Sequence, residues 1–321
     1  MTISRSWWTS RTLTTASGDT MGLFWQQEDD GMQRNKADCL SVQGFSHIRA
    51  GKECQDSSLC WQEKKYDGII ISDGHGGEKY IRSATGSRFA CEVGKEILSS
   101  FMETLENKRD FRRAFYTQSR EQEKMLSQLE RSIIQRWYER VAADLADHPL
   151  DTDDRYRALE EGDRAALVKS PVKAYGATFI AAVLTDSCFF VLKLGDGNAC
   201  LLTRDLHAQL LNHLFPQLVD DELQFNLTTS LCNSDADVAF KHCFCRLNDR
   251  RAVQGLILTT DGIINSYQSE QAYLGFIENI FAGYREQQRK DAHAELAEFL
   301  PRLSEKGSGD DLSVAIICRK K

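Results

Sequence analysis

The stretch Ile69-Ile70-Ile71-Ser72-Asp73-Gly74-His75-Gly76-Gly77 decides how the rest of this chain is interpreted. Three aliphatic residues lead directly into an aspartate, a glycine and a histidine, which predicts a buried strand that ends at Gly74. Glycine has no Cβ, so it permits unusual dihedral angles and a close approach of the backbone. Asp73 would then present its carboxylate and a neighbouring carbonyl to a cleft that suits a hard metal ion. The alternative, from this stretch alone, is an ordinary Asp-Gly turn.

The composition is that of an ordinary globular protein. The chain has 321 residues, of which 41% are hydrophobic and 27% are charged, enough for one large core or two small domains. A net charge of -7 argues against general nucleic-acid binding, which favours basic surfaces. There is no apolar run of about 18 residues and no signal-peptide pattern, so we expect no membrane span and a cytoplasmic location.

Ten cysteines are scattered along the chain without a paired framework. Cys243 and Cys245 follow His242 closely and invite a zinc site, but the spacing lacks a second pair of ligands. Reduced thiols are the better expectation, as in a cytosolic protein.

Hydrophobic periodicity predicts one domain of mixed strands and helices. Two short strands are expected between residues 39 and 61, and a central strand over 68–72. Phe89, Val93, Ile97 and Phe101 form one apolar stripe of a helix, and a longer helix is expected over 119–146. Further strands are predicted over 176–184, 188–194, 199–203, 255–260 and 312–318. Tight turns between the first three of these indicate an antiparallel meander, and two helical stretches precede the last strand.

The predicted domain covers residues 39–321 and includes a long helical or loop excursion at about 101–171. Within it, residues 147–171 contain two prolines and many acids, and so indicate a loop or extended segment. Residues 1–38 show no sustained period and are interpreted as an N-terminal arm or tail. Trp7, Trp8, Phe24 and Trp25 could anchor this arm to the domain or to a partner.

One residue type recurs at the strand ends. Asp56, Asp73, Asp196, Asp261 and Asp310 all stand there, and four of them adjoin a glycine. Carboxylates gathered from several strand ends repel one another unless a cation lies among them. A divalent ion, or two ions that share a carboxylate, would remove that cost. Five unrelated turn aspartates are the alternative.

Six motifs in this order resemble a known family. They are Gln55-Asp56, Asp73-Gly74-His75-Gly76-Gly77, Gly176-Ala177-Thr178, Gly195-Asp196-Gly197-Asn198, Thr260-Asp261-Gly262-Ile263 and Asp310-Asp311-Leu312-Ser313-Val314. Together they resemble the metal-dependent protein serine/threonine phosphatases of the PPM or type 2C family, and the Gln-Asp start resembles a bacterial branch. The resemblance covers about residues 40–318.

The resemblance implies an α+β fold, in which two antiparallel sheets form a central β-sandwich flanked by helix pairs. It also implies two Mg²⁺ or Mn²⁺ ions in a cleft at one end of the sandwich. By the family pattern, Asp73 bridges the ions and the Gly74 carbonyl binds one of them. Asp261 and Asp310 complete the other site, Asp56 orients water, and Asp196 matches a position associated with a third, weaker ion.

The chain departs from the family pattern at three places. An arginine that often binds phosphate is replaced by Gly51, and Lys52 or Arg49 could substitute for it. The family's Gly-Asp-Ser-Arg becomes Gly195-Asp196-Gly197-Asn198. An aspartate sometimes found four residues after Asp261 is Asn265.

The implied activity is hydrolysis of phosphoserine and phosphothreonine in proteins. Metal ions lower the pKa of water, so a hydroxide between two ions can attack a phosphoryl group without a protein nucleophile. His75 could protonate the leaving alkoxide, or could only hydrogen-bond a metal ligand. The expected partner is a phosphorylated protein, together with a cognate serine/threonine kinase that opposes the phosphatase. A catalytically inactive phosphatase-like binding module, and a two-metal hydrolase of nucleotides or small phosphate esters, are the alternatives.

Overall fold

The computed structural model describes residues 35–219 and 228–320. The predicted arm over 1–38, with its four candidate aromatic anchors, therefore lies outside the described residues, apart from the last few. The first strand begins at Lys36, so it includes the last three residues of the stretch assigned to the arm.

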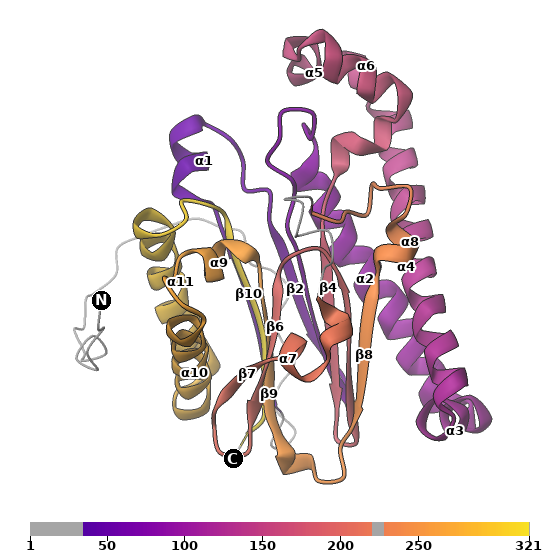
Figure 1. Cartoon of the computed structure of the whole chain (residues 1–321), viewed down its shortest axis with the longest axis vertical. Coiled ribbons are helices and arrows are strands. Elements are labelled where there is room, and N and C mark those ends of the chain that lie inside the picture. The colour runs from indigo at the N-terminus through magenta and orange to yellow at the C-terminus, as the bar shows by residue number, and fades with distance from the viewer. Residues whose placement is uncertain (1–34, 220–227, 321) are drawn as a thin grey trace. The chain divides into compact units, whose positions relative to one another are not determined.

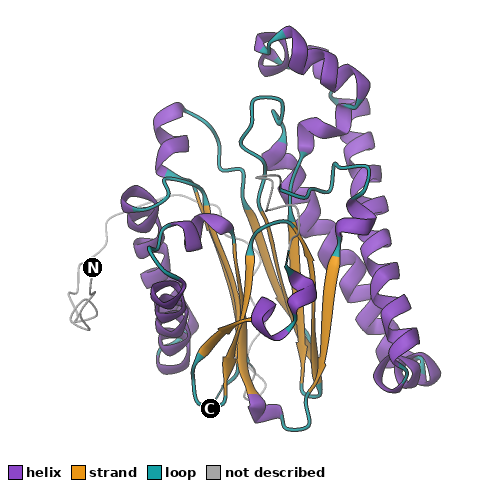
Figure 2. Cartoon of the chain, in the orientation of Figure 1, coloured by secondary structure: helices purple, strands orange, loops and turns teal. Residues whose placement is uncertain are grey.

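Ten strands of the described chain form two antiparallel sheets (Figure 2). The first sheet has the order β1 (Lys36–Val42), β10 (Leu312–Cys318), β9 (Val253–Thr259), β6 (Asn198–Thr203) and β7 (Ala208–Leu210). The second has the order β2 (Ser57–Gln62), β3 (Tyr66–Ser72), β4 (Phe179–Thr185), β5 (Cys188–Leu194) and β8 (Lys241–Arg246).

Helices cover the outer face of each sheet, as Figure 1 shows. The outer face of the first sheet packs against α9 (Asp261–Asn265), α10 (Glu270–Glu286) and α11 (Arg289–Lys306). The second packs against α2 (Ser83–Asn107), α3 (Arg109–Thr117) and α4 (Ser119–Asp147). Shorter elements are α1 (Phe45–Ala50), η2 (Leu150–Thr152), α5 (Asp154–Ala158), α6 (Glu161–Lys169), η3 (Pro171–Tyr175), α7 (Leu211–Leu214), η4 (Pro216–Leu218), α8 (Ala236–Ala239) and η6 (Arg250–Ala252). The predicted β-sandwich with flanking helices is confirmed.

The apolar run of β3 is explained by burial on both of its faces. Ile69 and Ile71 point into the core between the sheets, whereas Ile70 points into the core beneath α2 and α4. Alternate side chains of a strand face opposite sides, so a strand between two packed layers needs apolar residues at successive positions. The predicted stripe on α2 is confirmed as well, with Phe89 and Phe101 in the outer core.

Two expectations about topology were wrong. The strand over 199–203 does not continue the meander, because β6 leaves the sheet of β4 and β5 and pairs with β9 and β7 of the other sheet. Residues 147–171 are not an extended loop, since they contain α5 and α6. Both errors concern features that short-range periodicity does not encode, namely the choice of sheet and single-turn or two-turn helices.

Among the described helices, none has a stretch long and apolar enough to cross a membrane.

Candidate metal centre and active site

Strand register brings the predicted aspartates to one end of the sandwich. Ser57 pairs with Ser72 across β2 and β3, so Asp56 and Asp73 are adjacent at the end of the second sheet. In the first sheet Asn198 pairs with Thr259. The register therefore places Asp196, just before β6, beside Asp261, just after β9, and Asp310 precedes β10, which also pairs with β9.

The electrostatics show that these carboxylates influence one another. Burial raises the pKa of Asp73 well above its usual range, and the charges of Asp56, Asp261, Asp196 and Asp310 raise it further. Burial, and then Asp196, also raise the pKa of Asp261 to about 6. A cation placed among these groups would favour their charged forms.

The position of Asp73 is fixed by hydrogen bonds of its backbone to Thr178, so its side-chain carboxylate is not needed for this purpose. Its N–H donates to the Thr178 hydroxyl (2.9 Å), and its carbonyl accepts from the Thr178 N–H (2.8 Å). At the next residue, a Cβ added to Gly74 would lie 2.5 Å from the Gln55 carbonyl oxygen. Only glycine fits that gap, so the close approach expected from the sequence is present.

Two threonine hydroxyls that the sequence analysis missed orient other members of the cluster. Thr260 donates to Asp56 Oδ2 (2.9 Å), and Thr228 donates to Asp196 Oδ2 (2.7 Å). Asn265, the departure from the family pattern, donates to Asp261 Oδ2 (3.0 Å). Thr260, and Thr178 that binds the backbone of Asp73, lie inside the motifs quoted from the sequence, so these two threonines could have been recognised there. Thr228 lies outside the motifs.

Asp310 and Asp311 have different surroundings although they are neighbours. The buried Asp311 carboxylate accepts from the Gly44 and Gln55 N–H groups, each at 2.6 Å, and lies 2.9 Å from His47. It therefore fixes the segment that leads to Asp56. Asp310 is exposed, and its Oδ1 accepts from the Asp311 N–H at 2.9 Å.

The donor set fits a hard divalent cation by its chemistry. Carboxylates and a carbonyl are the oxygen ligands that Mg²⁺ and Mn²⁺ prefer. Asp56 Oδ1 is buried and has no hydrogen-bond partner among residues 35–219 and 228–320, which leaves one acceptor of this carboxylate unused there. Within residues 35–219 and 228–320, however, no three His, Cys, Asp or Glu side chains form a group that could hold an ion as they stand.

His75 lies beside the cluster in a half-buried position. Its ring packs against Tyr80, with 4.8 Å between the centroids. The backbone N–H of His75 donates to the Gly176 carbonyl (3.0 Å). Burial lowers the pKa of His75 to about 4, against the opposing effect of Asp196. The imidazole is therefore uncharged at neutral pH in this state.

Neither candidate phosphate-binding cation contacts the aspartates in the described structure. The exposed Lys52 lies 3.6 Å from Glu78, and Arg49 lies over the ring of Phe45 at 5.9 Å. Gly51 ends α1 with φ at 66°, in the left-handed region. An arginine at this position would be strained, which explains the departure from the family pattern.

The sequence profile described as protein phosphatase 2C matches residues 43–301, most of the chain. The chain belongs to the protein phosphatase 2C family. It is thus an enzyme of the metal-dependent protein serine/threonine phosphatase family, and the resemblance drawn from the six motifs is confirmed. A search among curated proteins found no match.

Solved phosphatase structures share the fold of this phosphatase. A bacterial serine phosphatase is 16% identical with a TM-score of 0.53, and the match covers 89% of this chain and 98% of that one. The serine/threonine phosphatase Stp1 from Staphylococcus aureus is 15% identical with a TM-score of 0.52, covering 92% and 99%. At this level of identity the likeness concerns the fold alone.

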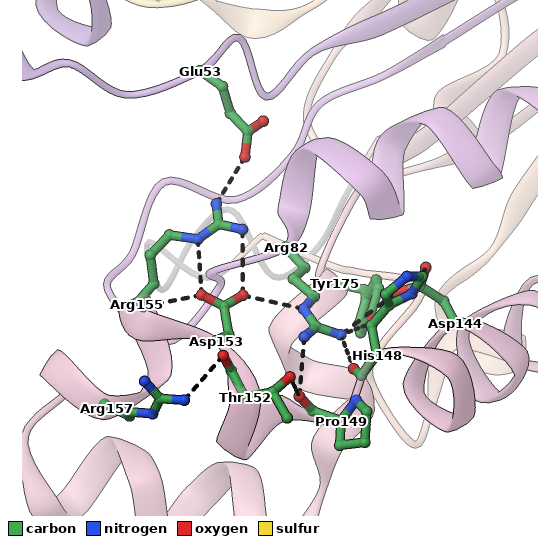
Figure 3. A network of polar contacts seen from close by, with 10 residues as sticks. All are labelled: Glu53, Arg82, Asp144, His148, Pro149, Thr152, Asp153, Arg155, Arg157 and Tyr175. Carbon is green, nitrogen blue, oxygen red and sulfur yellow. Dashed lines mark hydrogen bonds and ion pairs between the residues drawn. The ribbon is translucent and has the colours of Figure 1, made fainter.

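This phosphatase also has a polar network, centred on Arg82, that the sequence analysis did not predict (Figure 3). The buried Arg82 precedes α2. It donates to the His148 carbonyl (2.6 Å) and the Tyr175 hydroxyl (2.7 Å), and lies 3.5 Å from Asp144 and 3.4 Å from Asp153. An isolated arginine in the sequence gives no signal of such partners.

Arg155 extends the network toward the segment before Asp56. Its guanidinium lies 3.4 Å from Asp153 and donates to Glu53 (2.8 Å), three residues before Asp56 (Figure 3). The excursion between α4 and η3 is thus attached both to the start of α2 and to the loop that carries Asp56.

Proposed function

We propose that this phosphatase hydrolyses phosphoserine and phosphothreonine in proteins, at the end of the sandwich where the five aspartates converge. The observation that supports the proposal most directly is the environment of Asp73, whose pKa is raised by burial and by four other carboxylates. Such a group of acids is costly unless it binds cations. The expected substrate is a protein phosphorylated by a serine/threonine kinase.

Two divalent ions are the proposed cofactors, Mg²⁺ or Mn²⁺. Asp73 would be shared between them, with the Gly74 carbonyl on one side and Asp261 and Asp310 on the other. Asp196, held by Thr228, would reach only a weaker, peripheral ion. When bound, such ions activate water for in-line attack on phosphorus and neutralise charge on the phosphoryl oxygens.

Asp56 would orient the attacking water. Its Oδ2 accepts a hydrogen bond from the Thr260 hydroxyl, whereas its Oδ1 is buried without a partner in the described part of the chain. A carboxylate with one oxygen fixed and the other unused can accept a hydrogen bond from water in a defined direction. Lys52, with Arg49 as the second choice, would contribute positive charge for the substrate phosphate after a rearrangement of its exposed side chain.

His75 would supply the proton for the leaving serine or threonine oxygen. Its low pKa of about 4 means that this role requires the pKa to rise when a phosphoryl dianion is bound. The charge of Asp196 already acts in that direction. If the pKa stays low, His75 would act only as a neutral hydrogen-bonding group beside the ligands.

A metal titration on a substrate panel tests the proposal. We expect phosphopeptide hydrolysis to appear with Mn²⁺ or Mg²⁺ and to vanish on chelation, and phosphopeptides to be preferred over nucleotides and small esters. Full turnover in excess chelator, after verified removal of metal, would contradict the role of the ions. A preference for nucleotides would indicate a small-molecule phosphohydrolase, and metal binding without hydrolysis of any substrate would indicate a binding module.

A further inference from the structure

Two cysteines lie opposite each other where the two sheets meet at one edge of the sandwich. Cys39 is in β1 and Cys60 is in β2, and these are the first strands of the two sheet orders. Both side chains pack against the same apolar cluster between the sheets, and both are half-buried. Cys39 and Cys60 therefore lie in different sheets and are not neighbours within one sheet.

A pair of serines fixes how β1 and β2 face each other. The Ser41 hydroxyl donates to the Ser58 hydroxyl at 2.9 Å. Side chains two residues apart on a strand lie on the same face, so Cys39 shares the face of Ser41, and Cys60 shares the face of Ser58. Cys39 lies two residues before Ser41 and Cys60 lies two residues after Ser58, so Cys39 and Cys60 are the neighbouring pair that faces each other across the two strands. The serine contact shows that the facing side chains of β1 and β2 touch two residues away from the cysteines. A disulfide needs Cβ atoms about 3.5–4.5 Å apart.

The two thiols influence each other's ionisation. Cys60 is the largest influence on the Cys39 thiol and lowers its pKa. Cys39, followed by burial, raises the pKa of Cys60. Because the thiolate is the nucleophile in disulfide exchange, Cys39 is suited to attack first and Cys60 to react second.

We propose that Cys39 and Cys60 form a covalent modification site, at which a small-molecule disulfide oxidises the pair and links β1 to β2. The Cys39 thiolate attacks one sulfur of the small disulfide, whose S–S bond breaks and releases one thiolate, which is then protonated. Cys60 loses its proton and attacks the Cys39 sulfur of the mixed disulfide, which releases the second small thiol. Two electrons pass from the cysteine pair to the small disulfide, which is reduced to two thiols.

The crosslink would enclose residues 40–59, which contain α1 and Asp56. A closed loop of roughly 20 residues restricts the unfolded chain and stabilises the fold, if the bond forms without strain. The proposal does not depend on the phosphatase activity, since its readouts are the covalent state and the thermal stability of the protein.

Treatment of the full-length reduced protein with oxidised glutathione, followed by alkylation and peptide mapping, tests the proposal. We expect a peptide that joins Cys39 to Cys60, with a mass lower by two hydrogens, and its loss on reduction. The Tm should rise by about 5–10 °C on oxidation. In Cys60→Ser the reaction should stop at a glutathione adduct on Cys39.

The half-buried Cys245, on β8, provides the matched control, because burial raises its pKa. Cys245→Ser should keep both the crosslink and the Tm rise. Recovery of Cys39 and Cys60 as separate alkylated or glutathionylated peptides in the folded wild-type protein would overturn the proposal. A crosslink between other cysteines with Cys39 unmodified would overturn it too.

Discussion

Two groups of aspartates in this phosphatase have opposite electrostatic environments. Asp73 is surrounded by other carboxylates, and its pKa is raised. Asp153 faces Arg82 and Arg155; burial alone would raise its pKa, but hydrogen bonds and charge from these arginines lower it overall. Among the described residues, none of the five strand-end aspartates forms an ion pair. The same residue type is thus neutralised by arginines at one place, and at the other it has no positively charged partner in the described part of the chain.

Under the proposed function, this difference would separate structural acids from functional ones better than burial does. Asp153 and Asp144 are satisfied by a buried guanidinium within the chain (Figure 3). The strand-end aspartates have only hydroxyl, amide and backbone partners, which cannot balance negative charge. We therefore expect substitutions in the two regions to differ in both activity and stability.

The largest effect is expected for Asp73→Asn. Removing the shared carboxylate should lower phosphopeptide turnover by at least about 10³-fold and weaken Mn²⁺ binding. The metal-free variant should nevertheless be at least as stable as wild type. Because the pKa of Asp73 is raised on folding, its charged form opposes folding at neutral pH. Activity assays, calorimetric Mn²⁺ titration and thermal unfolding in chelator measure the three quantities.

Asp196→Asn and Asp237→Asn are the controls for this result. Asp196→Asn should weaken only a peripheral ion, and the exposed Asp237 on α8 should tolerate substitution. Equal loss of tight Mn²⁺ binding in Asp73→Asn and Asp196→Asn would contradict the assigned roles. A clear fall in the metal-free stability of Asp73→Asn would contradict the comparison itself.

A second large effect is expected for His75→Gln, and it should depend on the leaving group. General acid catalysis contributes about 10²–10⁴-fold, and a serine alkoxide needs a proton far more than nitrophenolate does. Turnover of phosphoserine peptides should therefore fall by about that factor, and turnover of nitrophenyl phosphate much less. An equal fall for both substrates with unchanged bound metal would show that His75 only shapes the ligand site.

Arg82→Gln tests the compensated region. Removing the buried cation takes a positive partner from Asp144 and from Asp153 and leaves Asp153 with the more exposed Arg155. Loss of a buried partner typically costs about 3–5 kcal/mol of unfolding free energy. Arg155→Gln is the matched variant. Its guanidinium is more than half exposed (54%), so we expect a loss of about 1 kcal/mol or less. Chemical denaturation measures both, and similar losses would mean that burial does not decide the strength of this network.

The local parts of the site could be predicted from the sequence. The Ile69–Ile71 run, with Asp73 and Gly74 after it, marks a doubly buried strand and its end. Asp261 and Asp310 were found in the same way, because a strand end and its neighbouring glycine lie within a few residues of each other. The family resemblance then supplied the sheet arrangement, which periodicity could not.

The parts that could not be predicted depend on contacts between distant residues. Nothing local in residues 198–203 shows that β6 joins the other sheet, since the pairing partner is more than 50 residues away. Arg82 and Asp153 have no shared motif. Thr228 lies in a segment whose sequence is mixed and polar and shows no periodicity, so its hydrogen bond to Asp196 could not be predicted from the sequence.

A smaller effect is expected at the exposed cation near the site. Lys52→Ala should raise KM for phosphopeptides by about 3–10-fold and leave kcat nearly unchanged, if the contact stabilises ground and transition states alike. Arg49→Ala is the matched variant and should change KM less, because Arg49 lies over Phe45. Unchanged KM in both variants would mean that the phosphate is held without either side chain.

The smallest effect concerns a third acidic group, the two glutamates beside His242. Their negative charge is balanced only while this histidine is protonated. His242 on β8 lies 2.7 Å from the buried Glu130 and 3.0 Å from Glu123, both on α4. Burial alone would lower the pKa of His242, but the hydrogen bonds and charges of Glu130 and Glu123 raise it overall.

The raised pKa gives this pair a definite pH dependence. A histidine whose pKa is higher in the folded than in the unfolded state stabilises the fold fully below the unfolded value of about 6.5. That contribution is lost as the pH rises through the folded value. The difference in unfolding free energy between wild type and His242→Gln should therefore be about 1 kcal/mol near pH 5.5 and shrink toward about pH 9. Denaturant titrations of both proteins at each pH cancel the titration of the aspartate cluster, which both share. A difference that grows with pH would show that Glu130 is not balanced by His242, and that its environment resembles that of Asp73 instead.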